Sequence, residues 1–247
     1  MPFALGGLAV ALQVFCLIHA IKSGADRTWI TILIILPGVG GIAYFLVELL
    51  PSILRSPQGQ QAKRDLQRKL DPERDYRRLK DQADDMPSVQ HLLALAEECT
   101  ALGKHREAAD LLARCVVGQY ADDPRLLLRY AQALLEAGDA AGTISALGRL
   151  RAANPDFQSP EGHLLYARAT AANGAAEKAL GEYRALMEYY PGPEPACRYA
   201  ELLTLLGREA EARDVWRELK RRYDRAPKHV RRLHAAWWDQ VVARSGV

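Results

Sequence analysis

Four glycines recur along this chain at spacings of 35, 36 and 33 residues, at Gly103, Gly138, Gly174 and Gly207. Five residues after each glycine comes a small side chain, in turn Ala108, Thr143, Ala179 and Ala212. A repeat of this length is typical of stacked helical hairpins, because one hairpin can bury its apolar face only against its neighbours. The spacing therefore predicts an all-α array with a long surface that is suited to binding rather than to catalysis.

The rest of the repeat supports this prediction. The units begin near residues 89, 124, 160 and 193, and the seventh position is Leu95, Tyr130, Tyr166 or Tyr199. An alanine follows each time, at Ala96, Ala131, Ala167 and Ala200. Small residues let two helices approach to about 8–10 Å, and a glycine can take the positive φ that ends a helix. The pattern resembles the tetratricopeptide repeat (TPR), which implies four TPR units over residues 88–227.

Two long apolar segments precede the repeats, over about residues 3–21 and 29–50. Each is close to the roughly 20 residues with which a helix crosses a bilayer core. Only a short polar loop lies between them, so residues 1–54 are expected to form a transmembrane hairpin. A cleaved signal peptide is the alternative for the first segment, but its start has no Lys or Arg and a second apolar segment follows directly.

The distribution of cations predicts the orientation of this hairpin. The loop between the segments contains Lys22 and Arg27, whereas residues 55–82 contain nine Lys or Arg. The positive-inside rule then places the repeats in the cytoplasm, at a bacterial inner membrane. The opposite topology, with a periplasmic array, stays open because both loop cations flank the apolar segments directly.

The second apolar segment has a distinctive pattern of Trp29, Pro37, Gly41 and Tyr44. With the residues before it, this pattern resembles the N-terminal hairpin of cardiolipin synthases and other phospholipase-D-type membrane proteins, over about residues 12–50. That resemblance implies shared ancestry of an anchor. The catalytic half of the family needs two His-x-Lys-x4-Asp motifs, and none of the six histidines has a lysine two residues later. The sequence therefore predicts no enzyme.

The net charge of +3 conceals a segregation of charge along the chain. Residues 55–82 sum to +4 and residues 219–247 to +6, so the repeats between them are acidic. We expect residues 55–87 to form a basic juxtamembrane helical linker that can contact anionic lipid headgroups, with a helix from about Asp71 to Asp84. Nucleic-acid binding is not expected, because the array is acidic and has no known reading motif.

The cysteines and histidines do not suggest a cofactor. Cys99, Cys115 and Cys197 lie in expected repeat helices without Cys-x-x-Cys spacing, and Cys16 lies in the first apolar segment. They are interpreted as small buried side chains in a reducing compartment. Neither a metal site nor a catalytic triad is predicted.

The last twenty residues, 228–247, are expected to form one amphipathic capping helix. Val230, Leu233, Trp237 and Val241 share a face at helical spacing, and an array needs a lid on its last apolar face. Trp237 is expected to be buried, and Trp238 to point elsewhere.

In the TPR family the first helix of each unit lines a partner-binding groove. Carried onto this chain, the groove positions are Arg125, Arg129, Gln132, Arg168, Asn173, Arg198 and Glu201, with Gln90 and Glu97 beside them. The arginines suit a peptide with acidic side chains or a free carboxylate. The function expected is a membrane-anchored scaffold that binds a protein partner. The alternative is a noncatalytic subunit of a phospholipid-synthesising membrane enzyme, engaged through the hairpin.

Overall fold

The structure, a computed structural model, describes residues 14–22, 27–35, 39–49, 51, 56–57, 60–61 and 70–244. These residues contain helices and no strand. The chain divides into two compact parts, the N-terminal part (residues 1–74) and the repeat array (residues 75–247), which are described separately.

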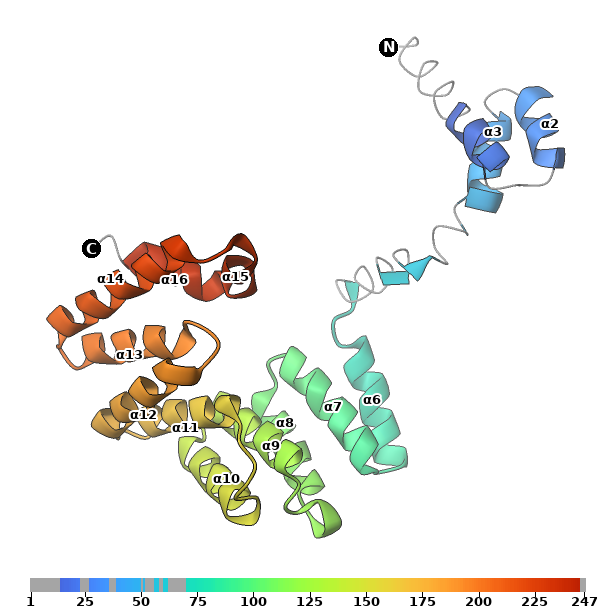
Figure 1. Cartoon of the computed structure of the whole chain (residues 1–247). Helices are drawn as coiled ribbons and strands as arrows, with labels where there is room; N and C mark the ends of the chain where they lie inside the picture. Colours follow the sequence, from blue (N-terminus) through green and yellow to red (C-terminus); the bar gives the residue numbers. More distant parts are fainter. Residues whose placement is uncertain are drawn as a thin grey trace. The chain divides into compact units, whose positions relative to one another are not determined.

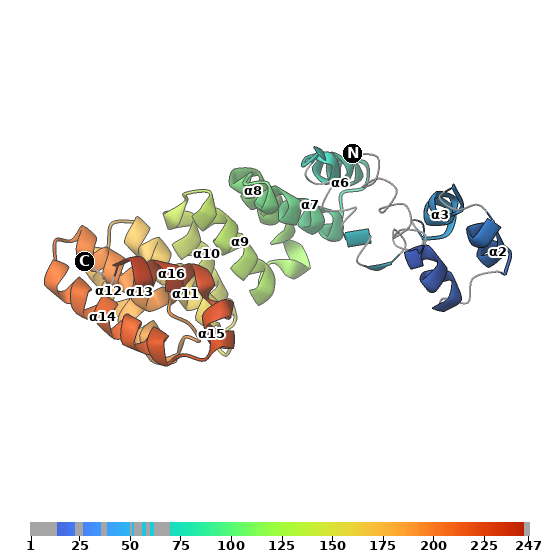
Figure 2. The same ribbon diagram turned by 90° about the horizontal axis from the view of Figure 1, so that it is seen from above.

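The repeat array is a succession of antiparallel helical hairpins, one for each repeat unit (Figure 1). We call the first helix of each hairpin the A helix and the second the B helix. The A helices are α7 (Val89–Ala101), α9 (Pro124–Glu136), α11 (Pro160–Ala172) and α13 (Glu194–Leu205). The B helices are α8 (His105–Cys115), α10 (Ala140–Ala153), α12 (Ala176–Tyr189) and α14 (Glu209–Arg225). Seen from above, the hairpins stack in chain order (Figure 2), as the sequence predicts.

Local chemistry explains where the A helices begin. Ser88, Asp123 and Ser159 each accept a backbone hydrogen bond from the first turn of the helix that follows. Pro124 and Pro160 occupy the first helical position, where no N–H is needed. A short 3-10 helix, η2 (Gly118–Tyr120), lies between the first two hairpins.

The four repeat glycines end the A helices with positive φ values of 72° to 84°. At the first turn, the N–H of Lys104 donates to the carbonyl of Cys99 at 2.8 Å, which closes the helix end. The small residues then lie where the two helices cross, and Ala108, Thr143 and Ala179 are fully buried. Thr143, the exception to alanine, donates its hydroxyl to the carbonyls of Ala131 and Asp139, so its polar atom is satisfied.

The helix before the array, α6 (Arg74–Asp85), begins three residues later than expected, after a turn at Asp71. Ala83 belongs to the core of the first hairpins, and Tyr76 packs against that core. The hydroxyl of Tyr76 donates to Glu107 at 2.8 Å, and the ammonium of Lys104 lies 3.5 Å from the Tyr76 ring centroid. This helix is therefore part of the packed array.

The prediction of one capping helix is wrong. The chain forms α15 (Lys228–Leu233) and α16 (Ala235–Arg244), with a bend at His234. The bend changes which residues face α14, so Trp238 and Val241 are buried while Leu233 is 78% exposed. The expectation for the two tryptophans is reversed, because Trp237 is only partly buried.

In the N-terminal part, the described residues 14–22, 27–35 and 39–49 form a cluster of helices around Tyr44. Residues 14–22 are helical, and α2 (Arg27–Ile35), α3 (Val39–Tyr44) and the π-helix η1 (Phe45–Leu49) follow. The Trp29 ring meets the Tyr44 ring edge-on at 5.6 Å, and the hydroxyl of Tyr44 lies 3.1 Å from Nδ1 of His19. Gly40 permits a close approach, since a Cβ there would lie 2.8 Å from the carbonyl oxygen of Ile32.

Among the residues that the structure describes, no helix has both the length and the apolar character needed to cross a bilayer. The described residues of the expected second span lie in α2, α3 and η1. Residues 3–13 of the expected first span, Pro37 and most of the basic segment 52–69 lie outside the described residues.

Candidate partner-binding groove

The predicted groove residues lie on the A helices, and the structure separates them into several local groups. The position after the buried alanine is occupied by Glu97, Gln132, Arg168 and Glu201 in the four units. Successive A helices therefore present different polar side chains at the same place, and only the third unit presents a cation there.

The first group joins the first two A helices. Nη2 of Arg129 lies 2.7 Å from Oε1 of Glu97, and Gln132 donates to Glu136 at 3.1 Å. Arg129 and Gln132 also line a hollow of about 170 Å³ between α7 and α9. The charge of Arg129 is already matched within the protein by an exposed carboxylate, and such pairs contribute little to stability.

Arg168 of α11 and Arg198 of α13 lie near each other and form the second group. Nε of Arg198 lies 2.7 Å from Oε1 of Glu194, and its guanidinium carbon lies 5.0 Å from the Trp237 ring centroid. Arg168 is half-buried, and within the described residues its guanidinium has neither a hydrogen bond nor an ion pair. Burial first, and then the nearby Arg198, lower the pKa of Arg168 below the usual arginine value, although the more distant carboxylates of Glu194 and Glu136 act to raise it.

Tyr183 shows that this region is sheltered from water. Its side chain is 3% exposed, and burial raises the pKa of its phenol to about 12 although Arg198 and Arg168 both act to lower it. A cation in such a place is more strongly attracted to an anion than one in open water. The arrangement can therefore hold a carboxylate at Arg168 without first breaking an internal ion pair.

The remaining predicted residues lie apart from this centre. Glu201 accepts a hydrogen bond from Gln240 of α16, so it connects the last unit to its cap. Arg125 is exposed in the first turn of α9, and Asn173 forms the C-terminal cap of α11 beside the turn glycine. The contacts of these three residues do not group them with Arg168.

Two contributors were missed by reasoning from sequence. Trp237 contacts Arg198 because the bend at His234 turns that face of α16 toward the array. Glu194 pairs with Arg198 at an i, i+4 spacing, a signal that the sequence does contain. In the part of the chain that the structure describes, no group of three His, Cys, Asp or Glu could hold a metal ion.

Comparison with known proteins agrees with the observed hairpins. Residues 100–169 match a family model described as tetratricopeptide repeat. No curated protein sequence matches the chain.

Solved structures with a similar fold include two of MamA. A MamA RS-1 double mutant aligns with a TM-score of 0.52 and 16% identity, over 68% of this chain and 95% of that one. The MamA 41-end structure from Desulfovibrio magneticus RS-1 aligns with a TM-score of 0.52 and 14% identity, over 66% and 91%. At these identities the likeness shows the fold alone, an all-helical solenoid of stacked hairpins.

Proposed function

We propose that this tetratricopeptide-repeat protein is a non-enzymatic scaffold that binds a protein partner in the groove of its A helices. The repeat architecture supports this, since stacked hairpins present an extended surface whose binding residues come from several units. The partner would offer an acidic side chain or a free carboxylate to the centre of the groove.

The observation on which the proposal rests is the environment of Arg168. A half-buried guanidinium without an internal partner is costly, because burial removes part of its hydration. A carboxylate from a partner would restore that loss through two parallel hydrogen bonds. Arg198, next to it, adds a second positive charge that is only partly offset by Glu194.

The test is a comparison of three variants with matched side chains. Arg168→Ala is expected to weaken recovery of crosslinked partners from native membranes by about tenfold or more, as expected for a charged pair that is largely desolvated. Arg168→Lys should restore only part of the binding, since lysine lacks the planar fork. Arg213→Ala, at an exposed arginine of the B helix α14, should change nothing. Equal recovery for Arg168→Ala and the wild type would refute the groove.

We further propose that the N-terminal part, residues 1–74, anchors the scaffold at a bacterial inner membrane, with the array in the cytoplasm. The support is the apolar surface of the described residues 14–22, 27–35 and 39–49, where Phe15 is 56%, Ile34 66% and Ile35 67% exposed. Exposed apolar patches of this kind are uncommon on soluble proteins. The basic segment that follows, residues 55–82, would bind the anionic lipid headgroups of that membrane.

Fractionation and a topology reporter test the anchor. The full chain should sediment with membranes and resist carbonate extraction, and a reporter fused after Val247 should be active only in its cytoplasmic form. A full chain that stays in the soluble fraction would contradict the proposal. A periplasmic reporter signal would establish the opposite topology.

The alternative, an accessory subunit of a phospholipid-synthesising enzyme, rests on the sequence resemblance of residues 12–50. Replacing residues 1–54 with an unrelated membrane anchor separates the two functions. Partner recovery that survives this replacement supports the scaffold, whereas its loss supports the accessory subunit.

A further inference from the structure

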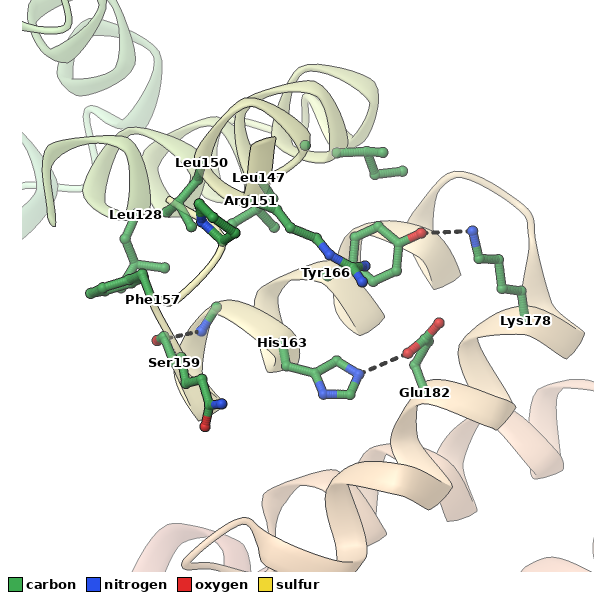
Figure 3. Close-up of a pocket in the computed structure, with 15 residues that line it drawn as sticks. Leu128, Leu147, Leu150, Arg151, Phe157, Ser159, His163, Tyr166, Lys178 and Glu182 are labelled. Carbon is green, nitrogen blue, oxygen red and sulfur yellow. Dashed lines mark hydrogen bonds and ion pairs between the residues drawn. The ribbon is translucent and has the colours of Figure 1, made fainter. Parts of the chain in front are cut away.

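A cleft of about 730 Å³ lies between the second and third repeat units (Figure 3). The B helices α10 and α12 line it together with parts of α9 and α11. It is separate from the groove of the A helices, because none of the predicted groove residues contributes to its lining. Its apolar lining includes Leu128, Ile144, Leu147, Leu150, Phe157 and Tyr166. Phe157 and Leu128 lie at one end of the cleft, and Lys178 lies at the other (Figure 3).

One position in the repeat explains why the cleft is open. The fourth residue of each unit is Leu92, Leu127, His163 and Ala196 in turn. In the first, second and fourth units this residue is at most 5% exposed and belongs to the core. In the third unit His163 turns toward α12, where Nε2 lies 2.7 Å from Oε2 of Glu182 and Nδ1 contacts the hydroxyl of Tyr189.

The core of the array is also divided at this place. Leu165 belongs to a buried cluster formed mainly by the first two units, whereas Leu164 belongs to a cluster formed by the last two units and the cap. The two clusters therefore separate within α11, on the helix from which His163 projects. Apolar side chains that would pack against each other in a continuous core instead line the cleft.

A glycine keeps the opening clear. Gly148 lies in the middle of α10 and lines the cleft, and a Cβ at this position would meet no atom within 4 Å. A glycine in a helix interior is less stable than alanine by roughly 0.5–1 kcal/mol, and packing does not require one here. Its effect is to leave room over Leu147 and Ile144.

Positive charge flanks the apolar lining. Arg151 extends into the cleft toward Tyr166 (Figure 3), and within the described residues it has no acidic partner. Nζ of Lys178 donates to the hydroxyl of Tyr166 at 2.6 Å rather than to a carboxylate. Glu182, the acidic group of the lining, is engaged by His163. An incoming carboxylate would therefore meet two cations whose charges are not matched by close contacts.

We propose that this inter-repeat cleft is a second binding site, which takes a segment of a protein partner that presents a large apolar side chain beside an acidic one. The apolar side chain would cover Leu128, Leu147 and Phe157, and the carboxylate would bind Arg151 and Lys178. A purely apolar occupant would leave both cations unmatched, and a basic one would be repelled. The proposal goes beyond the groove of the A helices and does not depend on it.

The test uses the full chain in detergent and a short fluorescein-labelled peptide with a central Leu-Phe pair between glutamates. Two control peptides carry lysines in place of the glutamates or serines in place of the Leu-Phe pair. Binding is followed by fluorescence anisotropy. Gly148→Trp should fill the cleft and weaken binding by about tenfold or more, the loss expected when one large apolar contact is removed.

Gly181→Trp is the matched control for this substitution. Gly181 lies in the interior of α12, it does not line the cleft, and a Cβ there also meets nothing within 4 Å. Its affinity should equal that of the wild type. Arg151→Glu should weaken binding as strongly as Gly148→Trp, and it tests the cleft if the tryptophan variant does not fold by circular dichroism.

Four results in the peptide-binding assay would overturn the proposal. They are no binding of the glutamate peptide up to about 1 mM, equal binding of the lysine peptide, unchanged binding by both Gly148→Trp and Arg151→Glu, or loss of binding in Arg168→Ala alone. The last result would assign the peptide to the groove instead. A dimer in analytical ultracentrifugation that becomes monomeric in Gly148→Trp would identify a second copy as the occupant, and so refute a partner peptide.

Discussion

Arg168 differs from the other arginines of the A helices in what surrounds it. Arg129 and Arg198 each have a carboxylate at 2.7 Å, whereas Arg168 is half-buried without one among the described residues. A protein that used this position for stability alone would gain by an apolar residue there, since well-packed apolar side chains often replace buried charges at no cost. We infer that the charge is retained for binding.

This interpretation predicts a gain in stability when the charge is removed. Arg168→Met keeps much of the length of the side chain and removes the desolvated guanidinium, so it should raise the free energy of unfolding by up to about 1 kcal/mol. Arg129→Met, which breaks an exposed ion pair, should change it by less than about 0.5 kcal/mol. Urea denaturation followed by circular dichroism measures both. A marked loss of stability in Arg168→Met would show that Arg168 is structural.

The buried thiols make stability depend on pH in the alkaline range. Burial raises the pKa of Cys99 from 9.0 to about 11, with Glu107 adding to the shift, and it raises that of Cys197 to about 12. The unfolded thiols ionise near pH 9 while the folded ones stay neutral. The stabilisation is therefore complete below about pH 9 and is lost as the pH rises toward 11 and 12.

Urea denaturation at several pH values between about 8 and 11 tests this dependence. The free energy of unfolding should fall by roughly 1 kcal/mol per pH unit for each buried thiol above its unfolded pKa. Cys99→Ala should reduce the slope, because alanine cannot ionise. An identical slope in the variant and the wild type would contradict the assignment.

At the scale of one helical element, two of the glycines in α10 and the turn before it have opposite requirements. Gly138 ends α9 with a φ of 83°, whereas Gly148 lies inside α10, where an added Cβ would have no atom within 4 Å. Gly138→Ala should destabilise the array by about 1–2 kcal/mol, because an L-residue is strained at positive φ. Gly148→Ala should stabilise it by roughly 0.5–1 kcal/mol.

Thermal unfolding of the two alanine variants measures this contrast directly. The prediction needs opposite signs, so two destabilised variants would indicate that Gly148 has a packing role that the structure does not show. The same pair separates a backbone requirement from a requirement for empty space, which a single substitution cannot do.

The capping segment shows where periodicity stops being sufficient. Its apolar residues fit one continuous helix, and that prediction fails because the chain bends at His234. The His234 ring packs close to Gly192, where an added Cβ would come within 2.9 Å of Cε1. This contact joins residues that are far apart in the sequence, so local spacing does not contain it. The bend then buries Trp238 and turns Trp237 toward Arg198.

For the whole molecule, the repeat array and the N-terminal part (residues 1–74) are expected to fold independently. The chain divides into compact units at residue 74, and the array has a core of its own. A fragment of residues 70–247 should stay helical and soluble, and it should keep its affinity for the glutamate peptide. Circular dichroism and anisotropy of the fragment check this. A fragment with little helicity would show that the array needs its N-terminal unit.

The repeat, its helices and their turns could all be predicted from the amino-acid sequence. These features depend on local chemistry, in which a glycine permits positive φ, a Ser or Asp caps a helix, and an alanine allows two neighbouring helices to cross. The helix starts at Val89, Pro124 and Pro160 follow from such signals. The predicted groove residues lie on the expected helices for the same reason.

Which of those residues act together depends on contacts that no local pattern contains. Whether an arginine has a partner depends on side chains from other elements, and Arg168 is distinguished by its burial and its neighbours on α12 and α13 rather than by anything in its own sequence neighbourhood. The cleft beside His163 likewise exists because one polar residue turns away from a core that three other units complete. Repetition establishes what the units have in common, whereas binding depends on where a unit departs from the others, and that depends on packing between units.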